Sequence, residues 1–322
     1  MAYEGGSLLG IAMDDTPLGE MYAKDFIDFM DAHVDGWVNR TILEVGPGRG
    51  YLLRLMNERG AEAIGVEPGA QNKVHWQRHG VDVRQGMFPS DALRGPYDVI
   101  VAHGVLEHIE DPITFLHAMR DVLHSKGMAF FAVPDCGPYI SAGDPSILLH
   151  EHYSYFTIGS LSRLLQIAGF GTVKILPAAH GGILYCMASP SSTVRSHFRS
   201  DNDQQAVTAY GHKVKKGRAR VAALGERIRH ASLSHGVYCP ARGLNLLPPG
   251  LAVRFFDDDH ELTGRYYPTF PYPVETRNDL VSRPVDELWI LSRSFGDHIR
   301  NELMMYDLKG SRVLTISELL EE

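Results

Sequence analysis

Three glycines follow a short, mostly apolar segment near the start of the sequence. Gly46, Gly48 and Gly50 come directly after residues 42–45, and a second apolar segment begins at residue 51. Glycine has no side chain, so such a turn lets the backbone approach a ligand closely. The spacing lacks the third glycine position of the dinucleotide fingerprint and the lysine of a phosphate-binding loop. The turn by itself therefore leaves the ligand open.

Two carboxylates accompany this turn and narrow the choice of ligand. Glu67 lies in the segment "GVEP", just before Pro68 and about twenty residues beyond the glycines, where an acidic side chain can accept two ribose hydroxyls. Glu44 stands just before the glycines, where it can bind an amino group. An amino acid joined to adenosine satisfies both carboxylates. We therefore predict S-adenosylmethionine as the cofactor and S-adenosylhomocysteine as its product. The predicted contacts in these two segments are Glu44, Gly46, Gly48, Gly50, Glu67 and Pro68.

Three further residues are expected at the same edge of the predicted sheet. In an open parallel sheet, ligands bind beyond the carboxyl ends of the strands, near the point where the strand order reverses. Met87 follows the third expected strand and is placed to lie on an adenine face, while His103 and Gly104 end the fourth. We predict that all three contact the cofactor.

A second cluster, "HEHYSYF" at residues 150–156, carries the residues best suited to catalysis. Methyl transfer from a sulfonium is an in-line displacement whose leaving group needs no proton, so the enzyme must align the acceptor and remove its proton. An imidazole that titrates near neutral pH suits the base role, which we assign to His152, with Glu151 as an orienting group. His108 in "VLEHIE" faces the same cavity or has a structural role at a helix start.

The remaining side chains of this cluster are expected to contact the acceptor and not to bind a metal ion. His150, Tyr153 and Tyr155 are predicted substrate contacts. His150 and His152 alternate on one extended segment and could face one zinc ion, but a catalytic zinc site normally has a third protein ligand, and no spacing marks one. We therefore expect no metal.

Composition excludes several classes of function. The chain has 322 residues and a formal net charge of −8, which argues against general affinity for nucleic acid. No run of eighteen apolar residues suggests a membrane span, so we expect no membrane partner and a cytoplasmic location. The three cysteines are scattered and predict neither a disulfide framework nor a structural zinc site.

Alternation of strands and helices predicts an α/β fold, with a doubly wound, Rossmann-like parallel sheet in the first domain and a second, smaller α/β domain. We expect a cofactor-binding domain over residues 1–190 and a C-terminal domain over 191–322, separated by the polar stretch 189–205. An antiparallel hairpin is expected to end the first sheet, and residues 135–155 are expected to be irregular. The first domain is expected to contain strands at 41–45, 61–67, 81–85, 97–103 and 127–134, helices at 17–34, 51–60, 70–80, 112–127 and 157–170, and the hairpin strands 171–178 and 182–189.

The segments "LEVGPGRG", "GVEP" and "YDVIVAHGVLEHIEDP" resemble the strand motifs of class I methyltransferases, over roughly residues 20–190. A narrower resemblance is to the sugar C-methyltransferases, which act on nucleotide-linked deoxysugars and carry a similar "EH-S-YF" segment. The segment "GVYCPARGLNLL" resembles their C-terminal domain, in which a glycine-rich loop follows a strand. The resemblance implies His152 as base, a nucleotide-linked sugar as acceptor, and substrate contacts by Arg242 and Asn245.

This sequence departs from the sugar C-methyltransferases in three ways. It has no N-terminal cysteine-rich zinc module, and it has Leu149 where those enzymes have a tyrosine. Its segment "CPARGLNLL" matches the glycine-rich loop of their C-terminal domain only approximately. Methylation at carbon, oxygen or nitrogen therefore stays open. The C-terminal domain is expected to bind substrate or to form a homodimer. The alternative is an accessory protein that keeps the nucleoside site without turnover; a nicotinamide dehydrogenase is less favoured, because the third fingerprint glycine is missing.

Overall fold

The chain is divided between two compact units whose sequences interleave. The computed structural model describes residues 17–93, 95–191, 201–248, 250–260, 262–308 and 310–320. Unit 1 comprises residues 1–136 and 150–198, and unit 2 comprises 137–149 and 199–322. Residues 192–200 of the polar stretch predicted as the boundary lie outside the described residues. The predicted division into two functional domains at residue 190 stays a prediction. The units differ from it in one respect, because residues 137–149 belong to unit 2.

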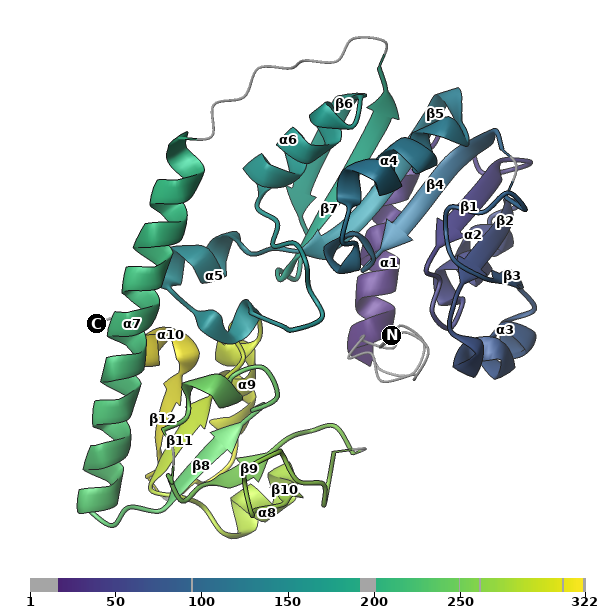
Figure 1. Ribbon diagram of the computed structural model, residues 1–322. Helices are drawn as coiled ribbons and strands as arrows, with labels where there is room; N and C mark the ends of the chain where they lie inside the picture. Colours follow the sequence, from purple (N-terminus) through teal and green to yellow (C-terminus); the bar gives the residue numbers. More distant parts are fainter. Residues whose placement is uncertain are drawn as a thin grey trace. The chain divides into compact units, whose positions relative to one another are not determined.

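Unit 1 is built on a seven-stranded sheet of order β3-β2-β1-β4-β5-β7-β6 (Figure 1). Strands β1 to β5 are parallel, and β7 runs antiparallel to both β5 and β6, which confirms the predicted antiparallel hairpin. The doubly wound fold expected from the sequence is therefore present. The strands are β1 (Thr41–Val45), β2 (Glu62–Glu67), β3 (Asp82–Gln85), β4 (Tyr97–His103), β5 (Leu123–Pro134), β6 (Phe170–Pro177) and β7 (Ile183–Pro190).

Helices cover both faces of this sheet because successive strand residues point to opposite sides. Phe130 packs against Phe29 of α1, while its neighbour Phe131 lies in the core cluster that also includes Leu116 of α4 and Leu161 of α6. The helices of unit 1 are α1 (Pro17–Asp31), α2 (Tyr51–Glu58), α3 (Lys73–His79), α4 (Pro112–Asp121) and α6 (Ile158–Ile167), with short 3-10 turns η2 (Ala70–Asn72) and η3 (Leu106–His108).

Caps fix where two of these helices begin. Asp111 accepts the Thr114 N–H at the start of α4, and Thr157 accepts the Ser160 N–H in a capping box at the start of α6. Both starts agree with the sequence-based prediction.

The boundary between α4 and β5 differs from the prediction. The sequence suggested a helix from residue 112 to 127 followed by a strand, but α4 ends at Asp121 and β5 begins at Leu123. Leu123 pairs with Tyr97 across an irregular register between β4 and β5. Pairing with β4 thus outweighs the helical periodicity of the sequence, because the strand gains backbone hydrogen bonds and a buried leucine.

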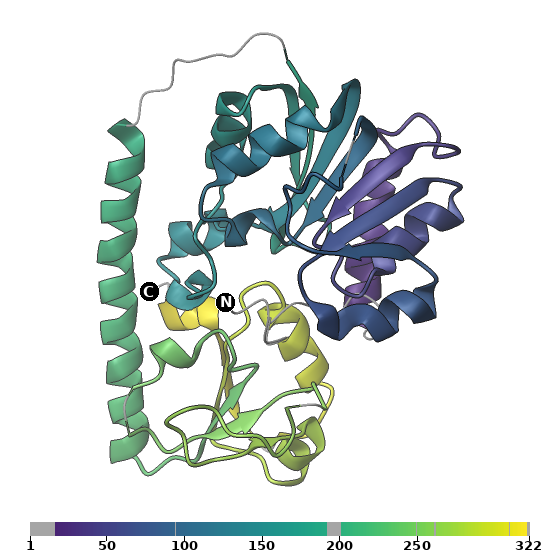
Figure 2. The ribbon, with the colours of Figure 1, turned by 45° about the vertical axis from the view of Figure 1, so that its right-hand side comes forward.

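Unit 2 contains a parallel five-stranded sheet of order β10-β9-β8-β11-β12 (Figure 2). Residues 135–155 are not wholly irregular as predicted, because they contain α5 (Gly137–Ala142) and η4 (Pro145–Ile147). The other elements are α7 (Asp201–His230), β8 (His235–Tyr238), η5 (Leu244–Leu246), β9 (Arg254–Phe256), β10 (Val274–Glu275), α8 (Arg277–Ser282), β11 (Glu287–Ile290), α9 (Gly296–Leu303), β12 (Arg312–Thr315) and α10 (Ile316–Leu320).

The segment 137–149 is fastened to unit 2 by polar contacts. Asp144, which is fully buried, forms an ion pair with Arg293 at 2.6 Å, and its carbonyl accepts the Tyr210 hydroxyl at 3.0 Å. Lys213 of α7 donates to the Ser141 carbonyl at 2.6 Å. The chain thus enters unit 2 before it returns to unit 1.

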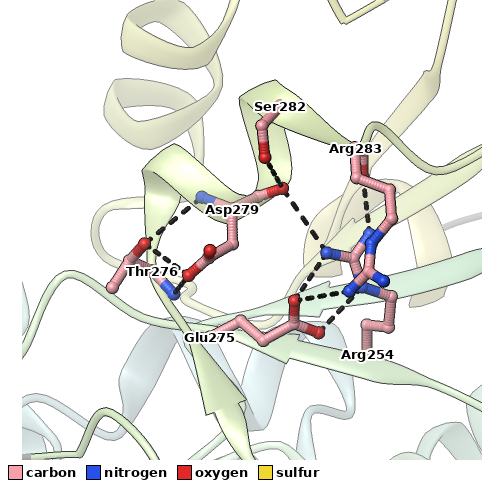
Figure 3. A network of polar contacts seen from close by, with 6 residues as sticks. All are labelled: Arg254, Glu275, Thr276, Asp279, Ser282 and Arg283. Carbon is pink, nitrogen blue, oxygen red and sulfur yellow. Dashed lines mark hydrogen bonds and ion pairs between the residues drawn. The ribbon is translucent and has the colours of Figure 1, made fainter.

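A polar network holds the two-residue strand β10 against β9 (Figure 3). Arg254 donates to both carboxylate oxygens of Glu275, at 2.8 and 2.6 Å, and Arg283 donates to the same carboxylate at 3.0 Å. These bonds lower the pKa of Glu275. Because the Arg254–Glu275 pair is bidentate and half-buried, it fixes geometry as well as adding charge attraction. Thr276 and Asp279 then cap α8 reciprocally.

Among the described residues, every helix is too short or too polar to cross a lipid bilayer.

Candidate functional site

The glycine turn after β1 combines two tight contacts with one open position. Gly46, Gly48 and Gly50 all have positive φ, at 70°, 54° and 82°, a conformation that favours glycine. A Cβ atom at Gly46 would lie 2.6 Å from Val105, and one at Gly50 would lie 2.8 Å from Val81. A Cβ at Gly48 would meet no described atom within 4 Å. The outer glycines thus permit packing, and the middle one leaves room for a ligand.

Glu67, the last residue of β2, is fixed by this turn. One carboxylate oxygen accepts the Gly48 N–H at 3.2 Å and the other accepts the Gly69 N–H at 2.9 Å. Burial raises the pKa of Glu67, and these two backbone bonds act in the opposite direction. Each oxygen keeps acceptor capacity for a further donor. The carboxylate is therefore held in a position suited to a pair of ribose hydroxyls.

Trp76 is a support of the turn that the sequence reasoning missed. Its indole Nε1 donates to the Gly48 carbonyl at 2.7 Å, and a Cβ on Gly50 would lie 3.4 Å from its ring. No sequence motif marks this role, since a tryptophan in a helix is first read as core.

Glu44 is buried at the centre of the strand ends. It is 2% exposed, and one of its oxygens, Oε2, has no hydrogen-bond partner among the described residues. Burial, and then the charge of Glu67, raise its pKa to about 8. A positively charged ligand group would stabilise the ionised form. An ammonium near Glu44 and a ribose near Glu67 match the two ends of S-adenosylmethionine, so the residues fit the predicted cofactor.

The other predicted cofactor contacts occupy neighbouring positions of unit 1. Burial lowers the pKa of His103 to about 4, so its imidazole is neutral, and its ring packs edge-on against Phe26 of α1 at 5.0 Å. Gly104, with φ of 66°, donates its N–H to Ala132. Met87 is 62% exposed after β3, and Pro68 is half-buried beside Glu67.

Two histidines and a carboxylate meet beside the end of β4. One ligand-type atom each from Glu107, His108 and His152 lies within 4.8 Å of the others, and we call these three residues the Glu107 cluster. The His108 and His152 rings are 4.8 Å apart, and the Tyr155 ring is 6.0 Å from His152. The structure therefore brings together His108 and His152, both predicted from the sequence, and adds Glu107.

Glu107 was missed because the sequence does not reveal its burial. It is 4% exposed, burial raises its pKa to about 7, and its Oε2 has no hydrogen-bond partner among the described residues. Its position beside His108 in "VLEH" was the available signal. Its carbonyl accepts the Tyr153 and Ser154 N–H groups at 2.8 and 3.2 Å, which ties the loop carrying His152 to η3.

Other predicted acceptor contacts are more exposed. The His150 side chain is 88% exposed and lies 3.6 Å from the Glu151 carboxylate. Tyr153 is 63% exposed. Arg242 and Asn245 lie in unit 2 after β8, Arg242 just before η5 and Asn245 within it, and Asn245 donates to the Pro145 carbonyl at 3.3 Å. Their predicted contact with substrate stays a prediction.

The part of the chain that carries this site is similar in sequence to known methyltransferases. Residues 22–175, just under half of the chain, match a family model described as a methyltransferase domain. Ubiquinone biosynthesis O-methyltransferase of Acinetobacter baumannii is 25% identical over 173 residues, covering 48% of this chain and 73% of the relative. C-methyltransferase NovU of Streptomyces niveus is 26% identical over 161 residues, covering 47% and 38%. The solved structure of a Burkholderia thailandensis 1,6-didemethyltoxoflavin-N1-methyltransferase is 19% identical, with a TM-score of 0.42, and covers 53% of this chain and 79% of that chain.

Proposed function

We propose that this protein, an S-adenosylmethionine-dependent methyltransferase, methylates a sugar nucleotide or a similar small polar metabolite at carbon, oxygen or nitrogen. The observation that carries the proposal is the Glu107 cluster, which gathers two imidazoles and a buried carboxyl at the end of β4. That strand is adjacent to β1, whose glycine turn fits the cofactor. The sugar acceptor is further supported by the resemblance of residues 150–156 to the sugar C-methyltransferases.

The cofactor, when bound, supplies an electrophilic methyl group. Glu67 would accept the ribose hydroxyls, and Glu44 would stabilise the amino group. The open position at Gly48 would let the cofactor backbone lie close to the chain. Because burial keeps His103 neutral, this side chain adds no positive charge to the end of β4.

In this proposal, His152 takes the acceptor's proton. His108 lies beside it, and the His108 Nδ1–H donates to the Glu151 carbonyl at 3.0 Å, which fixes the loop between them. Glu151 thus orients the site through its backbone. A base within reach of the acceptor typically contributes about 10²- to 10⁴-fold to the rate.

We further propose that unit 2 binds the part of the acceptor that does not react, or forms a dimer contact. In its sheet, the strand order reverses between β8 and β11, which is where open α/β sheets bind ligands. The segment after β8, which includes η5, carries Arg242 and Asn245. A guanidinium suits a phosphate group of a nucleotide-linked sugar.

The test is incubation with methyl-labelled S-adenosylmethionine and a panel of nucleotide sugars and related hydroxy and amino metabolites. We expect one class of acceptor to gain a single label, and mass spectrometry of the product locates the methyl group. If the protein binds S-adenosylhomocysteine by calorimetry but labels nothing in a panel that includes sugars with each common nucleotide, the sugar-nucleotide proposal is wrong.

A further inference from the structure

We propose that Glu107, His108 and His152 bind one divalent transition-metal ion. Their ligand-type atoms lie within 4.8 Å of one another, close enough for a single ion to draw them together. Two imidazole nitrogens and a carboxylate oxygen suit zinc, iron, cobalt or manganese better than calcium or magnesium, which prefer oxygen ligands.

The hydrogen bonding of His108 leaves one ring nitrogen suited to a metal. Its Nδ1 lies 3.0 Å from the Glu151 carbonyl oxygen. A carbonyl only accepts, so the proton resides on Nδ1, and Nε2 carries the lone pair that a metal requires. Metal-bound histidines commonly donate their other nitrogen to such a carbonyl, which fixes both tautomer and ring orientation.

The buried carboxyl of Glu107 provides an independent indication. The residue is 4% exposed, and Oε2 has no hydrogen-bond partner among the described residues. A buried carboxylate is costly unless it is paired or coordinates a metal. A cation at the Glu107 cluster would supply the missing interaction.

The backbone holds the ligands in place from two distant segments. The Glu107 carbonyl accepts the N–H groups of Tyr153 and Ser154, and these residues directly follow His152. Glu107 and His108 belong to the short turn η3, so these bonds tie the turn to the loop that carries His152. The ligands therefore need little reorganisation to bind an ion.

The Glu107 cluster also provides the third protein ligand that the sequence did not reveal. The sequence offered His150 and His152 without a further ligand, but the His150 side chain is 88% exposed. The structure replaces it with His108 and adds Glu107, giving three protein ligands and leaving positions open for an acceptor, as in catalytic zinc sites.

The inference rests on the proposed methyl transfer for its chemical consequence. A bound cation lowers the pKa of a coordinated acceptor hydroxyl, whose proton leaves to water. The hydroxyl oxygen then forms a bond to the methyl carbon as the carbon–sulfur bond breaks, and the sulfonium becomes a neutral thioether. With the ion bound, His152 is a ligand and the ion activates an acceptor hydroxyl; the base role proposed above for His152 belongs to the metal-free protein.

Metal binding is measured directly on the full chain after treatment with a chelator. Co²⁺ and Zn²⁺ are titrated by calorimetry, and Co²⁺ is also followed by its visible absorption. We expect one ion per chain, and we expect Glu107→Gln and His152→Gln each to weaken binding at least about tenfold. The control is His150→Gln, an exposed histidine two residues away, which should bind as the wild type does.

Circular dichroism and binding of S-adenosylhomocysteine verify that each variant is folded. Failure of the wild type to bind one ion, or unchanged affinity in both cluster variants, would overturn the proposal. If the wild type binds one ion but methylates nothing, the metal site stands and the proposed function fails. If chelated protein binds no added ion and methylates at full rate, the metal site fails and the function stands with His152 as base.

Discussion

Replacing Glu67 by glutamine tests the assignment of the cofactor site most directly. The amide keeps the volume of the side chain but removes its charge and one of its two acceptor oxygens. The carboxylate holds the N–H groups of Gly48 and Gly69 and is 8% exposed, so water cannot readily replace the lost interactions. In Glu67→Gln, the amide NH₂ group cannot accept a hydrogen bond, so one backbone N–H or one donating ribose hydroxyl loses its charged acceptor.

The magnitude follows from the strength of hydrogen bonds to charged groups. Each is worth about 1.5–3 kcal/mol, and an unpaired buried donor adds to the loss. Losing one such bond to the ribose corresponds to a dissociation constant about 10- to 150-fold higher. We expect this shift for S-adenosylhomocysteine in calorimetry. Glu62→Gln, an exposed residue at the opposite end of the same strand, is the matched control. Equal affinity in Glu67→Gln and wild type would refute the reasoning.

Three further predictions follow. His152→Ala should lower turnover by about 10²- to 10⁴-fold with nearly unchanged affinity for S-adenosylhomocysteine; a near-wild-type rate excludes the base role. Gly48→Ala and Gly80→Ala both place alanine at positive φ without a clash. Each should lower the free energy of unfolding by about 1–2 kcal/mol, but only Gly48→Ala should weaken cofactor binding. Burial lowers the pKa of His235 to about 4, so unfolding favours protonation and stability should fall as the pH drops from about 6.5 towards 4, by up to about 1.4 kcal/mol per pH unit; His235→Phe should remove this part of the slope in urea titrations.

The sequence predicted best where a pattern is local. Strand β1 occupies residues 41–45 and β4 occupies 97–103, as expected, because solid apolar runs bounded by turns define buried parallel strands. The end of α4 could not be predicted, since Leu123 satisfies a helical period equally well and only its pairing with Tyr97 decides the outcome. Local patterns therefore define the buried strands better than the ends of helices.

The same distinction holds for the site. The glycines and Glu67 could be predicted as site residues because their spacing forms a motif. His108 and His152 could be predicted because histidine is a common catalytic residue type. The place of Glu107 in the cluster depends on its burial and on its contact with a loop more than forty residues away, which no local pattern encodes. For the same reason α5 was missed: it has six residues, and its contacts with α7 come from distant sequence.

The excursion of residues 137–149 into unit 2 has a consequence for synthesis on the ribosome. This segment emerges before α7 and Arg293, the partners that bury Asp144, have been made. A nascent chain that has completed β7 can pair the whole sheet of unit 1, yet it must keep the loop between β5 and His150 undocked until the last strands appear. A fragment cut at residue 190 would leave the buried carboxylate of Asp144 without its arginine, and the missing contacts adjoin the loop that carries His152. Final folding of the loop that carries His152 is thereby coupled to completion of the chain.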